Sequence, residues 1–533
     1  MLLLQKNKTR EIILLGLILS IIAIVIIRSA WVCDDAFITF RTVDNFTNGY
    51  GLRWNVSERV QAYTNPLWML LCSSIYFFTK EIYFTSIIAS ICLTLIALSI
   101  FAFNISNSIP SSVLGLTAIL FSKAFIDYST SGMENPLTHV LIALFLLLYL
   151  KKDFTTKNYF FLILIASFAF VNRMDTSLLY IPAIIFYTAN LKNYSKSIKL
   201  FLAGSLPIII WESFSIFYYG FPFPNTAFGK LNTGIDGMKL VHHGLLYLQK
   251  SITFDPLTLV IITCAILLPA FKKDLRKIMV SIGILLYLFY IIRIGGCYMS
   301  GRYLSAPFFC SIIIIFSSVA RFSSKGKIII LSILMILGLI VPYPTIFSGK
   351  DYGVGRDWSF YHFQKNIVDD RGRMYQKYGL LKVMKNGLPS FGYEMEKARK
   401  DSFAFGGAIG HFSFDAGPGV HVLDGYALAD PLLARLPAVE TEDFWVGHYG
   451  RCAPPGYVET LKTGINKIID REIAEYYDKL SIIVKGSITD NRRLTEIWNF
   501  NIGKYENLVK PLFKSPKKEW YRIQLEQQRT SWN

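Results

Sequence analysis

The chain has 533 residues, 53% of them hydrophobic, and its mean hydropathy is +0.39. Long apolar runs recur along it, which is typical of a polytopic α-helical membrane protein and excludes an ordinary soluble enzyme. The formal net charge is +18. Much of this excess lies in short clusters between apolar runs, which indicates the positive-inside pattern of membrane proteins and argues against binding to nucleic acid.

The apolar runs predict about eleven membrane-spanning helices, because a span needs ~20 apolar residues with some latitude for tilt. No small-residue cleavage site follows the first run, so we expect a retained first helix. The predicted spans cover residues 12–28, 82–103, 111–128, 135–150, 158–171, 177–190, 198–216, 256–271, 277–293, 303–320 and 327–347.

Basic clusters between these spans give the predicted topology, because Lys and Arg concentrate in cytoplasmic loops. The clusters lie at residues 6–10, 151–157, 192–199, 272–277 and 321–327. With these clusters inside, the N-terminus is cytoplasmic and the C-terminal region is outside. The outer side then also holds the loops at residues 131–136, 172–176, 218–255 and 295–302.

A polar loop at residues 29–81 follows the first span on the predicted outer side. Its tail, Pro66–Phe78, is apolar enough for a span but short. Counting it as a crossing would place every later basic cluster outside. We therefore predict that Pro66–Phe78 forms an interfacial helix, at a depth that suits Trp68 and Tyr76.

The composition changes after Ser348, and no further span follows. Residues 349–533 contain a helix-like stretch at Asp470–Leu480 and strand-like runs at His421–Leu423 and Ser481–Val484. This region is long enough for one independent domain. We therefore predict a transmembrane domain over residues 1–348 and an extracytoplasmic α/β domain over residues 349–533.

Asp34 and Asp35 are the candidate catalytic residues. An acidic pair near a helix end is often only a cap for the helix that follows. Carboxylates close to a membrane span are costly unless they are used or paired, which favours a functional role here. A carboxylate accepts the proton of a sugar hydroxyl as a general base, or attacks an anomeric carbon as a nucleophile. Adjacent residues point in different directions, so we expect one Asp to act and the other to position a partner or a cation.

Four cationic residues on the predicted outer side are candidate ligands for an anionic head group. An arginine near a helix end also has a simpler interpretation, in which its side chain reaches the polar interface. Together they suit a lipid phosphate, because arginine can bind two phosphate oxygens at once. These residues are Arg173, Lys230, Arg293 and Arg302.

Further outer residues are candidates for contacts with a sugar or an acceptor. Glu134 either begins the helix at Asn135–Pro136 or acts as a third outer carboxylate. The histidines of the C-terminal region have no diagnostic ligand spacing, so the metal requirement is unknown. The sugar and acceptor set comprises Arg41, Trp54, Glu58, Tyr63, Asn65, Trp68, Glu134 and Asn225.

Several short motifs, in the same order along the chain, resemble the GT-C class of polytopic glycosyltransferases. They are DDAFITFR, NGYGLRWN, ERVQAYTNPLW, SGMEN, YYGFPFPNT and GGCYMSGR, followed by GHFSFDAGPGVHVLDGYALADPLLARLP and VGHYGRCAPPGYVETL. Within that class, the chain resembles the mycobacterial terminal arabinofuranosyltransferase family. One departure is Cys297, which stands where an acidic residue is expected after two glycines.

The resemblance implies an enzyme of the bacterial cytoplasmic membrane that transfers D-arabinofuranose from a polyprenyl-phosphate donor to an extracytoplasmic glycan. It also implies that an acid of the first outer loop acts at the reacting centre, which corresponds to Asp34 or Asp35. No cofactor is certain, and a divalent cation is one candidate. One alternative is the same chemistry with another lipid-linked sugar, or with a protein or lipopolysaccharide acceptor. A second is a transporter or flippase for a lipid-linked sugar, which would favour internal repeats and intramembrane polar residues.

Overall fold

The computed structural model describes residues 2–151, 153–317, 323–354, 362–363, 367–439, 445–514 and 521–522. Lys152 and Arg321, which belong to two of the predicted cytoplasmic clusters, lie outside these ranges. The chain packs into two compact units, each assembled from three stretches of sequence. Unit 1 comprises Met1–Cys33, Tyr83–Ile208 and Leu240–Pro389, and unit 2 comprises Asp34–Ile82, Ile209–Lys239 and Ser390–Asn533. The predicted division after Ser348 stays a prediction about which part lies outside the membrane.

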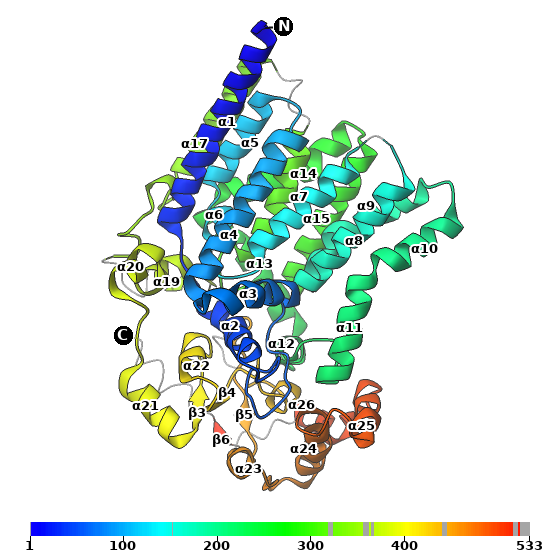
Figure 1. Ribbon diagram of the computed structural model, residues 1–533, viewed down its shortest axis with the longest axis vertical. Helices are drawn as coiled ribbons and strands as arrows, with labels where there is room; N and C mark the ends of the chain where they lie inside the picture. The colour runs from blue at the N-terminus through cyan, green and yellow to red at the C-terminus, as the bar shows by residue number, and fades with distance from the viewer. Residues whose placement is uncertain are drawn as a thin grey trace. The chain divides into compact units, whose positions relative to one another are not determined.

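Unit 1 is a bundle of mostly apolar helices (Figure 1). Helix α9 packs on α15, α8 on α10, α14 on α16 and α5 on α17. Its elements are α1 (Leu2–Ser29), α4 (Ile82–Ser99), the π-helical turn Ile100–Ile105, α5 (Ile109–Phe121), α6 (Lys123–Asp127), α7 (Asn135–Tyr149), α8 (Thr156–Asn172), η2 (Met174–Thr176), α9 (Ser177–Ala189), α10 (Tyr194–Gly204), α14 (Pro256–Phe271), α15 (Leu275–Arg293), η3 (Arg302–Leu304), α16 (Ser305–Phe316), α17 (Ser324–Leu339), η5 (Thr345–Phe347), β1 (His362–Phe363), β2 (Ile367–Val368), α19 (Asp370–Tyr378) and α20 (Leu380–Asn386).

Length and composition qualify only some of the described helices as complete membrane spans. Three stretches are long and apolar enough: Arg10–Ser29, Ile82–Ile105 and Leu275–Arg293. Two bent pairs raise the number to five if each pair is one broken span: Tyr194–Gly204 with Leu206–Tyr219, and Gly237–Phe254 with Pro256–Phe271. Other apolar helices have 10–17 residues. The mostly helical, apolar architecture is confirmed, whereas the count of about eleven spans is not.

Two predicted segments differ from the structure in this region. The single span predicted at residues 111–128 is wrong, because α5 ends at Phe121 and α6 begins at Lys123. Between them Ser122 is extended, and its hydroxyl accepts the N–H of Phe125, which starts a new helix. The loop predicted at residues 218–255 is largely helical, since it contains α12 (Asn225–Leu231) and all of α13 (Gly237–Phe254).

Unit 2 combines the first polar loop with the end of the chain. Helix α2 packs on α3 and α22, and α24 packs on α25 and α26. Besides α12 and the last part of α11 (Leu206–Tyr219), its elements are α2 (Asp34–Thr47), α3 (Pro66–Thr79), α21 (Gly392–Asp401), β3 (Phe403–Gly406), α22 (His411–Ala416), β4 (His421–Asp424), η6 (Leu433–Arg435), β5 (Cys452–Ala453), α23 (Tyr457–Thr463), α24 (Arg471–Val484), α25 (Asn491–Asn501), α26 (Glu506–Lys514) and β6 (Tyr521–Arg522).

The described strands form three two-stranded sheets. Strands β1 and β2 are antiparallel, as are β5 and β6, whereas β3 and β4 run parallel in the register Phe403↔His421 to Gly406↔Asp424. Strand β4 confirms the strand predicted at His421–Leu423.

The strand predicted at Ser481–Val484 is wrong, because these residues form the last turn of α24. The helix begins after Asp470, whose carboxylate accepts the N–H groups of Glu472 and Ile473 at 3.1 and 3.2 Å. Its apolar residues then recur at the spacing of one helix face, so the short apolar run follows the helical period. The buried positions are Ile473, Tyr476, Tyr477, Leu480, Ile483 and Val484.

Unit 2 holds its polar loop in place through a shared apolar core. Ile38 of α2, with Trp54 and Ala62 of the loop, packs against residues of α21, α22 and β4. These partners are Met395, Ala398, Ile409, Phe412, Ala416, Val420 and Val422. The loop is therefore part of the interior of unit 2 and not an appendage on a helix bundle.

Unit 1 contains a buried network of two cations and two anions. Lys123 contacts Asp127 and lies 3.0 Å from Asp369 Oδ1, while Arg371 Nε lies 2.7 Å from Asp127 Oδ1. The Tyr352 hydroxyl accepts from Lys123 Nζ at 3.0 Å and donates to Asp369 at 2.5 Å. The four charges balance, which allows all of them to be buried at 0–7% side-chain exposure.

We expect Asp369→Ala to lower the free energy of unfolding by about 3–5 kcal/mol, because it leaves Lys123 and Arg371 buried with one anion between them. Thermal unfolding of the detergent-solubilised chain, followed by intrinsic fluorescence, measures the change. The matched control is Glu506→Ala, which removes an exposed i,i+4 pair with Lys510 and should cost less than about 1 kcal/mol. Equal shifts in the two variants would show that the buried network contributes no special stability.

Candidate functional site

Asp34 is the first residue of α2, and its carboxylate joins that helix to a segment more than 370 positions away in the sequence. Its Oδ2 accepts the backbone N–H of Gly410 at 3.1 Å, and its Oδ1 accepts that of His411 at 3.0 Å. The two N–H groups belong to the start of α22, where the helix itself supplies no acceptors. Both Asp34 oxygens therefore stabilise the chain's own backbone.

Position 410 requires glycine, because the backbone there lies very close to Asp34. A Cβ at position 410 would lie 1.9 Å from the Asp34 carbonyl oxygen and 2.4 Å from its Oδ2. Next to it, the ring of Phe37 contacts the rings of His411 and Phe414, with centroids 4.7 and 5.6 Å apart. Burial lowers the pKa of His411 to about 4, so this imidazole is neutral at physiological pH. Asp35 follows Asp34 on α2 and is half-buried.

Arg41 lies further along α2 than Asp34 and Asp35. Its guanidinium is surrounded by backbone carbonyls. It donates to the oxygens of Trp54 and Val420 at 2.7 Å each, and also to that of Ser413. The guanidinium lies over the Trp54 ring, 4.7 Å from its centroid. Burial lowers its pKa to about 9, although the charge of Asp44 opposes the shift. Its hydrogen bonds hold the loop and the 413–420 segment to α2.

The aromatic candidates of the loop are buried inside unit 2. Trp54 and Trp68 have no exposed surface, and Tyr63 is 1% exposed. The Tyr63 hydroxyl lies 2.8 Å from that of Tyr219, and the Asn65 amide oxygen accepts from Thr39 at 3.1 Å. In this arrangement the three rings support the loop from within, and a stacking role toward sugars stays a prediction.

Glu58 is 1% exposed. It belongs to another buried cluster of charged groups, which lies in unit 2. Burial raises its pKa to about 7; Asp430 adds to the rise, whereas Lys485 and Asn55 oppose it. Asp430 accepts from the Tyr457 hydroxyl at 2.9 Å and from the Leu433 N–H at 2.7 Å, and burial raises its pKa to about 6. Glu58 and Asp430, whose pKa values are both raised, thus lie near Lys485.

Asn225 and Lys230 both lie on α12. The Asn225 amide donates to the carbonyls of Ala427, Leu428 and Asp430 at 3.0–3.2 Å, and its oxygen accepts from Arg435 at 3.1 Å. The amide therefore shapes the 427–430 turn. The half-buried Lys230 side chain passes over Gly447, with Nζ 3.5 Å from where a Cβ would stand.

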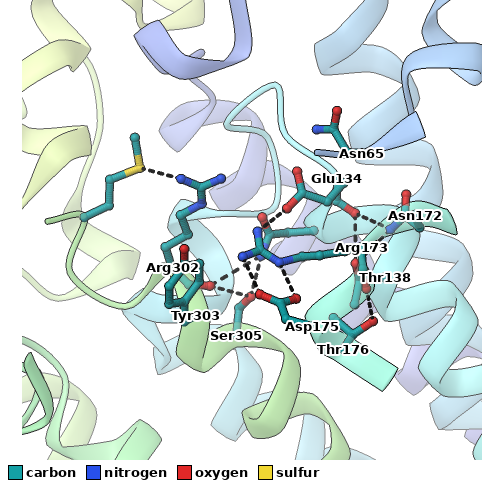
Figure 2. A network of polar contacts seen from close by, with 12 residues as sticks. Asn65, Glu134, Thr138, Asn172, Arg173, Asp175, Thr176, Arg302, Tyr303 and Ser305 are labelled. Atoms are coloured by element: carbon teal, nitrogen blue, oxygen red, sulfur yellow. Dashed lines mark hydrogen bonds and ion pairs between the residues drawn. The ribbon is translucent and has the colours of Figure 1, made fainter. Parts of the chain in front are cut away.

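Arg173 in unit 1 binds two carboxylates at once (Figure 2). Its Nε and Nη2 donate to Asp175 at 2.7 and 2.8 Å, and its Nη1 donates to Glu134 at 2.5 Å. The Tyr303 ring lies 4.7 Å from the guanidinium carbon. Three of the five guanidinium N–H donors are therefore used by the chain's own anions.

The backbone around Arg173 is held by short side-chain bonds. The Asn172 amide donates to the Glu134 carbonyl at 3.3 Å and to Thr138 Oγ1 at 2.9 Å. The Asn135 amide donates to Ser305 Oγ at 2.8 Å. These bonds join the starts of α7 and α16 to the end of α8, so Glu134 and Arg173 meet in a fixed geometry.

Arg302 approaches the same cluster from a glycine-rich turn (Figure 2). Gly301 has φ +80°, and a Cβ there would lie 3.1 Å from Ala124 Cα. The Arg302 side chain is 8% exposed, with Nη1 3.7 Å from the Met299 sulfur and its guanidinium carbon 5.7 Å from the Tyr303 centroid. Arg173, Arg302, Glu134 and Asp175 together carry no net charge. Arg293 is exposed at the end of α15 and is not part of this cluster.

The structure thus places the predicted residues in two groups, one in each unit. Asp34, Asp35, Arg41, Glu58, Asn65, Asn225 and Lys230, with the three aromatics, belong to unit 2, and Glu134, Arg173 and Arg302 belong to unit 1. Within the described ranges, no three His, Cys, Asp or Glu side chains converge as a metal site would require.

Sequence reasoning missed the residues that only long-range packing brings together. Lys123 and Asp127 give an i,i+4 signal, but Asp369 and Arg371 lie more than 200 positions away. Gly410 was present in one of the family-like motifs, without any sign that it contacts Asp34. Asp430 and Lys485 likewise gave no sign that they lie close to Glu58.

Comparisons with known proteins found two curated relatives and one distant structure. No family model matches the chain. A terminal beta-(1->2)-arabinofuranosyltransferase of Mycobacterium tuberculosis is 24% identical over 327 residues, covering 52% of this chain and 51% of the relative. The protein of the same name from Corynebacterium glutamicum is 25% identical over 323 residues, covering 52% and 46%. The chain thus spans about half the length of the curated relatives it matches. These matches confirm the predicted resemblance.

Among solved structures, the crystal structure of ArnT from Cupriavidus metallidurans bound to undecaprenyl phosphate is similar to part of the chain. The TM-score is 0.38 at 12% sequence identity, and the likeness covers 61% of this chain and 63% of that chain. This similarity is distant, and no residue of the candidate site is placed by it.

We expect Gly410→Ala to destabilise the chain by about 1–3 kcal/mol, because the new methyl group overlaps the Asp34 carbonyl and carboxylate. The matched control is Gly419→Ala, where a Cβ would meet nothing within 4 Å. Thermal unfolding of both variants in the same detergent measures the difference. Identical melting curves would show that the contact between Asp34 and the start of α22 is absent in solution.

The buried Glu58 carboxyl predicts a pH-dependent stability. Its pKa is raised in the folded state from 4.5 to about 7. The folded chain therefore holds this proton more tightly, and stability falls as pH rises from about 4.5 through 7. Glu58→Gln removes this effect, so we expect the variant to gain about 2–3 kcal/mol relative to wild type between pH 5 and pH 8. Thermal unfolding of both proteins at the two pH values tests it, and a constant difference would contradict it.

Proposed function

We propose that the chain is a membrane glycosyltransferase that transfers a pentofuranose, D-arabinofuranose, from a polyprenyl-phosphate donor to a glycan hydroxyl outside the cytoplasmic membrane. The observation that carries this proposal is the similarity to two relatives named terminal beta-(1->2)-arabinofuranosyltransferase. The apolar helices of unit 1 suit an enzyme that takes its donor from the bilayer. The sequence holds no P-loop or dinucleotide-binding signature, which agrees with a donor that is not a nucleotide.

We assign the reacting carboxylate to Asp35 and a positioning role to Asp34. Both oxygens of Asp34 accept backbone N–H groups of Gly410 and His411, so its carboxylate keeps α2 and α22 together. Asp35 is the next residue on α2 and points about 100° away around the helix axis. The rigid start of α2 thereby holds the Asp35 carboxylate in one direction.

The Asp35 carboxylate can promote transfer by two routes. As a general base it takes the proton of the acceptor hydroxyl while that oxygen attacks the anomeric carbon, and the bond from that carbon to the phosphate oxygen breaks. As a nucleophile it first displaces the lipid phosphate from the anomeric carbon and forms a glycosyl ester, and the acceptor hydroxyl then displaces the carboxylate, which takes up the hydroxyl proton. The first route inverts the anomeric configuration and the second retains it, so the product's stereochemistry distinguishes them.

We assign the leaving lipid phosphate to Arg302. Arg173 is already engaged by Glu134 and Asp175, which makes it a support for the surrounding loops. Arg302 extends from the turn that Gly301 permits and lies in the same polar cluster as Arg173 (Figure 2). Its guanidinium suits a phosphate, because arginine can form two charged hydrogen bonds to phosphate oxygens.

We expect Asp35→Asn to reduce transfer by about 10²–10⁴-fold without lowering the melting temperature, because it removes only the reacting charge. Asp34→Asn should lower the melting temperature, because an amide oxygen accepts only one of the two N–H groups well. The assay follows a labelled sugar from a synthetic polyprenyl-phosphate donor to an oligosaccharide acceptor. Full activity of Asp35→Asn would contradict the assignment of the reacting carboxylate to Asp35. Wild-type protein that moves the lipid-linked sugar across vesicles without forming a glycosidic bond would instead indicate a flippase.

A further inference from the structure

Helix α25 exposes an apolar stripe that the proposed reaction does not use. Leu494, Trp498 and Ile502 are spaced by four residues along it and are 50%, 68% and 58% exposed. The opposite face, with Arg493 and Ile497, is buried in unit 2. A tryptophan that is two-thirds exposed between two large aliphatic side chains indicates a surface with a partner.

The buried face fixes α25 at the end of an apolar helix. Arg493 donates from Nη1 to the carbonyl of Phe217 and from Nη2 to that of Tyr218, each at 2.7 Å. The Asn501 amide donates to the Gly220 carbonyl at 2.8 Å. These carbonyls belong to the last turn of α11 and the residue that follows it, where the helix lacks its own donors. Figure 1 shows α25 beside this end of α11.

The neighbouring part of α11 has a surface suited to lipid. Leu206–Tyr219 forms one arm of a bent pair that is apolar enough to cross a membrane. Its residues Ile209, Ile210, Ile216 and Phe217 are 41–65% exposed, a combination that water disfavours and hydrocarbon accepts. The exposed Phe217 is the residue whose carbonyl binds Arg493. Exposed apolar residues therefore lie on both α11 and α25, the two helices that Arg493 joins.

We propose that α25 lies in the membrane–water interface, with Leu494, Trp498 and Ile502 inserted among the lipids that surround the end of α11. Tryptophan is enriched at this depth because its ring is apolar and its N–H is polar. Lys504, an exposed basic residue, stands near the C-terminal end of the stripe, where lipid phosphates lie. The α24–α26 region is thereby held at the bilayer surface, independently of which sugar is transferred.

A membrane explains this stripe better than a protein partner does. A second copy of the chain would have to cover Trp498 while leaving the exposed apolar residues of α11 in contact with lipid. The bilayer satisfies both surfaces at once, because the end of α11 already sets the depth of α25. An amphipathic helix with aromatic and basic residues is also the usual form of an interfacial anchor.

Spin labels on the full-length chain in lipid nanodiscs test the proposal. One label replaces Ile502, on the stripe, and a control label replaces Ile469, which is 74% exposed in unit 2 just before α24. The background carries serine at Cys92, Cys264 and Cys452, because these cysteines are not buried in the described chain. Collision rates are measured with oxygen, which concentrates in lipid, and with a water-soluble nickel chelate. Both labelled proteins must elute and melt like wild type.

We expect the label at 502 to collide several-fold more with oxygen than with the nickel chelate, relative to the label at 469. Equal accessibility to the nickel chelate at both positions would overturn the proposal, because it would place α25 in water. A label at 502 that is shielded from both reagents would also overturn it. Cross-linking between copies of Ile502→Cys would then identify a second chain as the partner, and its absence would indicate another protein.

Discussion

The close contact between Asp34 and the start of α22 is the constraint on which unit 2 depends. An ordinary residue at position 410 would overlap the Asp34 backbone, so only glycine allows the two segments to meet. Arg41 adds bonds from α2 to Trp54, Ser413 and Val420. Buried backbone groups and a buried guanidinium are costly to leave unpaired, so these contacts favour a single arrangement of the loop. The first polar loop is thus placed by residues near the end of the chain.

Charge neutralisation decides which predicted residues are available for chemistry. Lys123 and Arg371 are balanced by Asp127 and Asp369, and Arg173 is balanced by Glu134 and Asp175. A basic composition therefore does not mean that every arginine near the outer side is a ligand. Arg173 in particular is bound by two carboxylates of the chain itself, which the sequence did not show.

The same distinction applies to the polar residues of the loop. Asn225 and Arg41 have chemistry suited to sugar binding, yet they donate hydrogen bonds to the chain's own carbonyls. Trp54, Tyr63 and Trp68 support the loop from its interior. A motif shared with a glycosyltransferase family therefore contains residues that build the site as well as residues that would touch substrate. Sequence similarity cannot separate these roles, because both kinds of residue are equally restricted in type.

The sequence by itself determined the helical membrane architecture, the resemblance to arabinofuranosyltransferases and the helix at Pro66–Thr79, because these follow from local hydrophobicity and from the order of motifs. The sequence pattern predicted a strand at Ser481–Val484, where the helical period of α24 outweighs a short apolar run. It also predicted one span across residues 111–128, where the Ser122 hydroxyl caps a new helix. Only the tertiary structure decided that Asp34 meets Gly410, that Glu58 lies near Asp430, and that Arg173 is bound by two carboxylates. These contacts join residues far apart in the chain, and their energies depend on burial and neutralisation, which no local pattern contains.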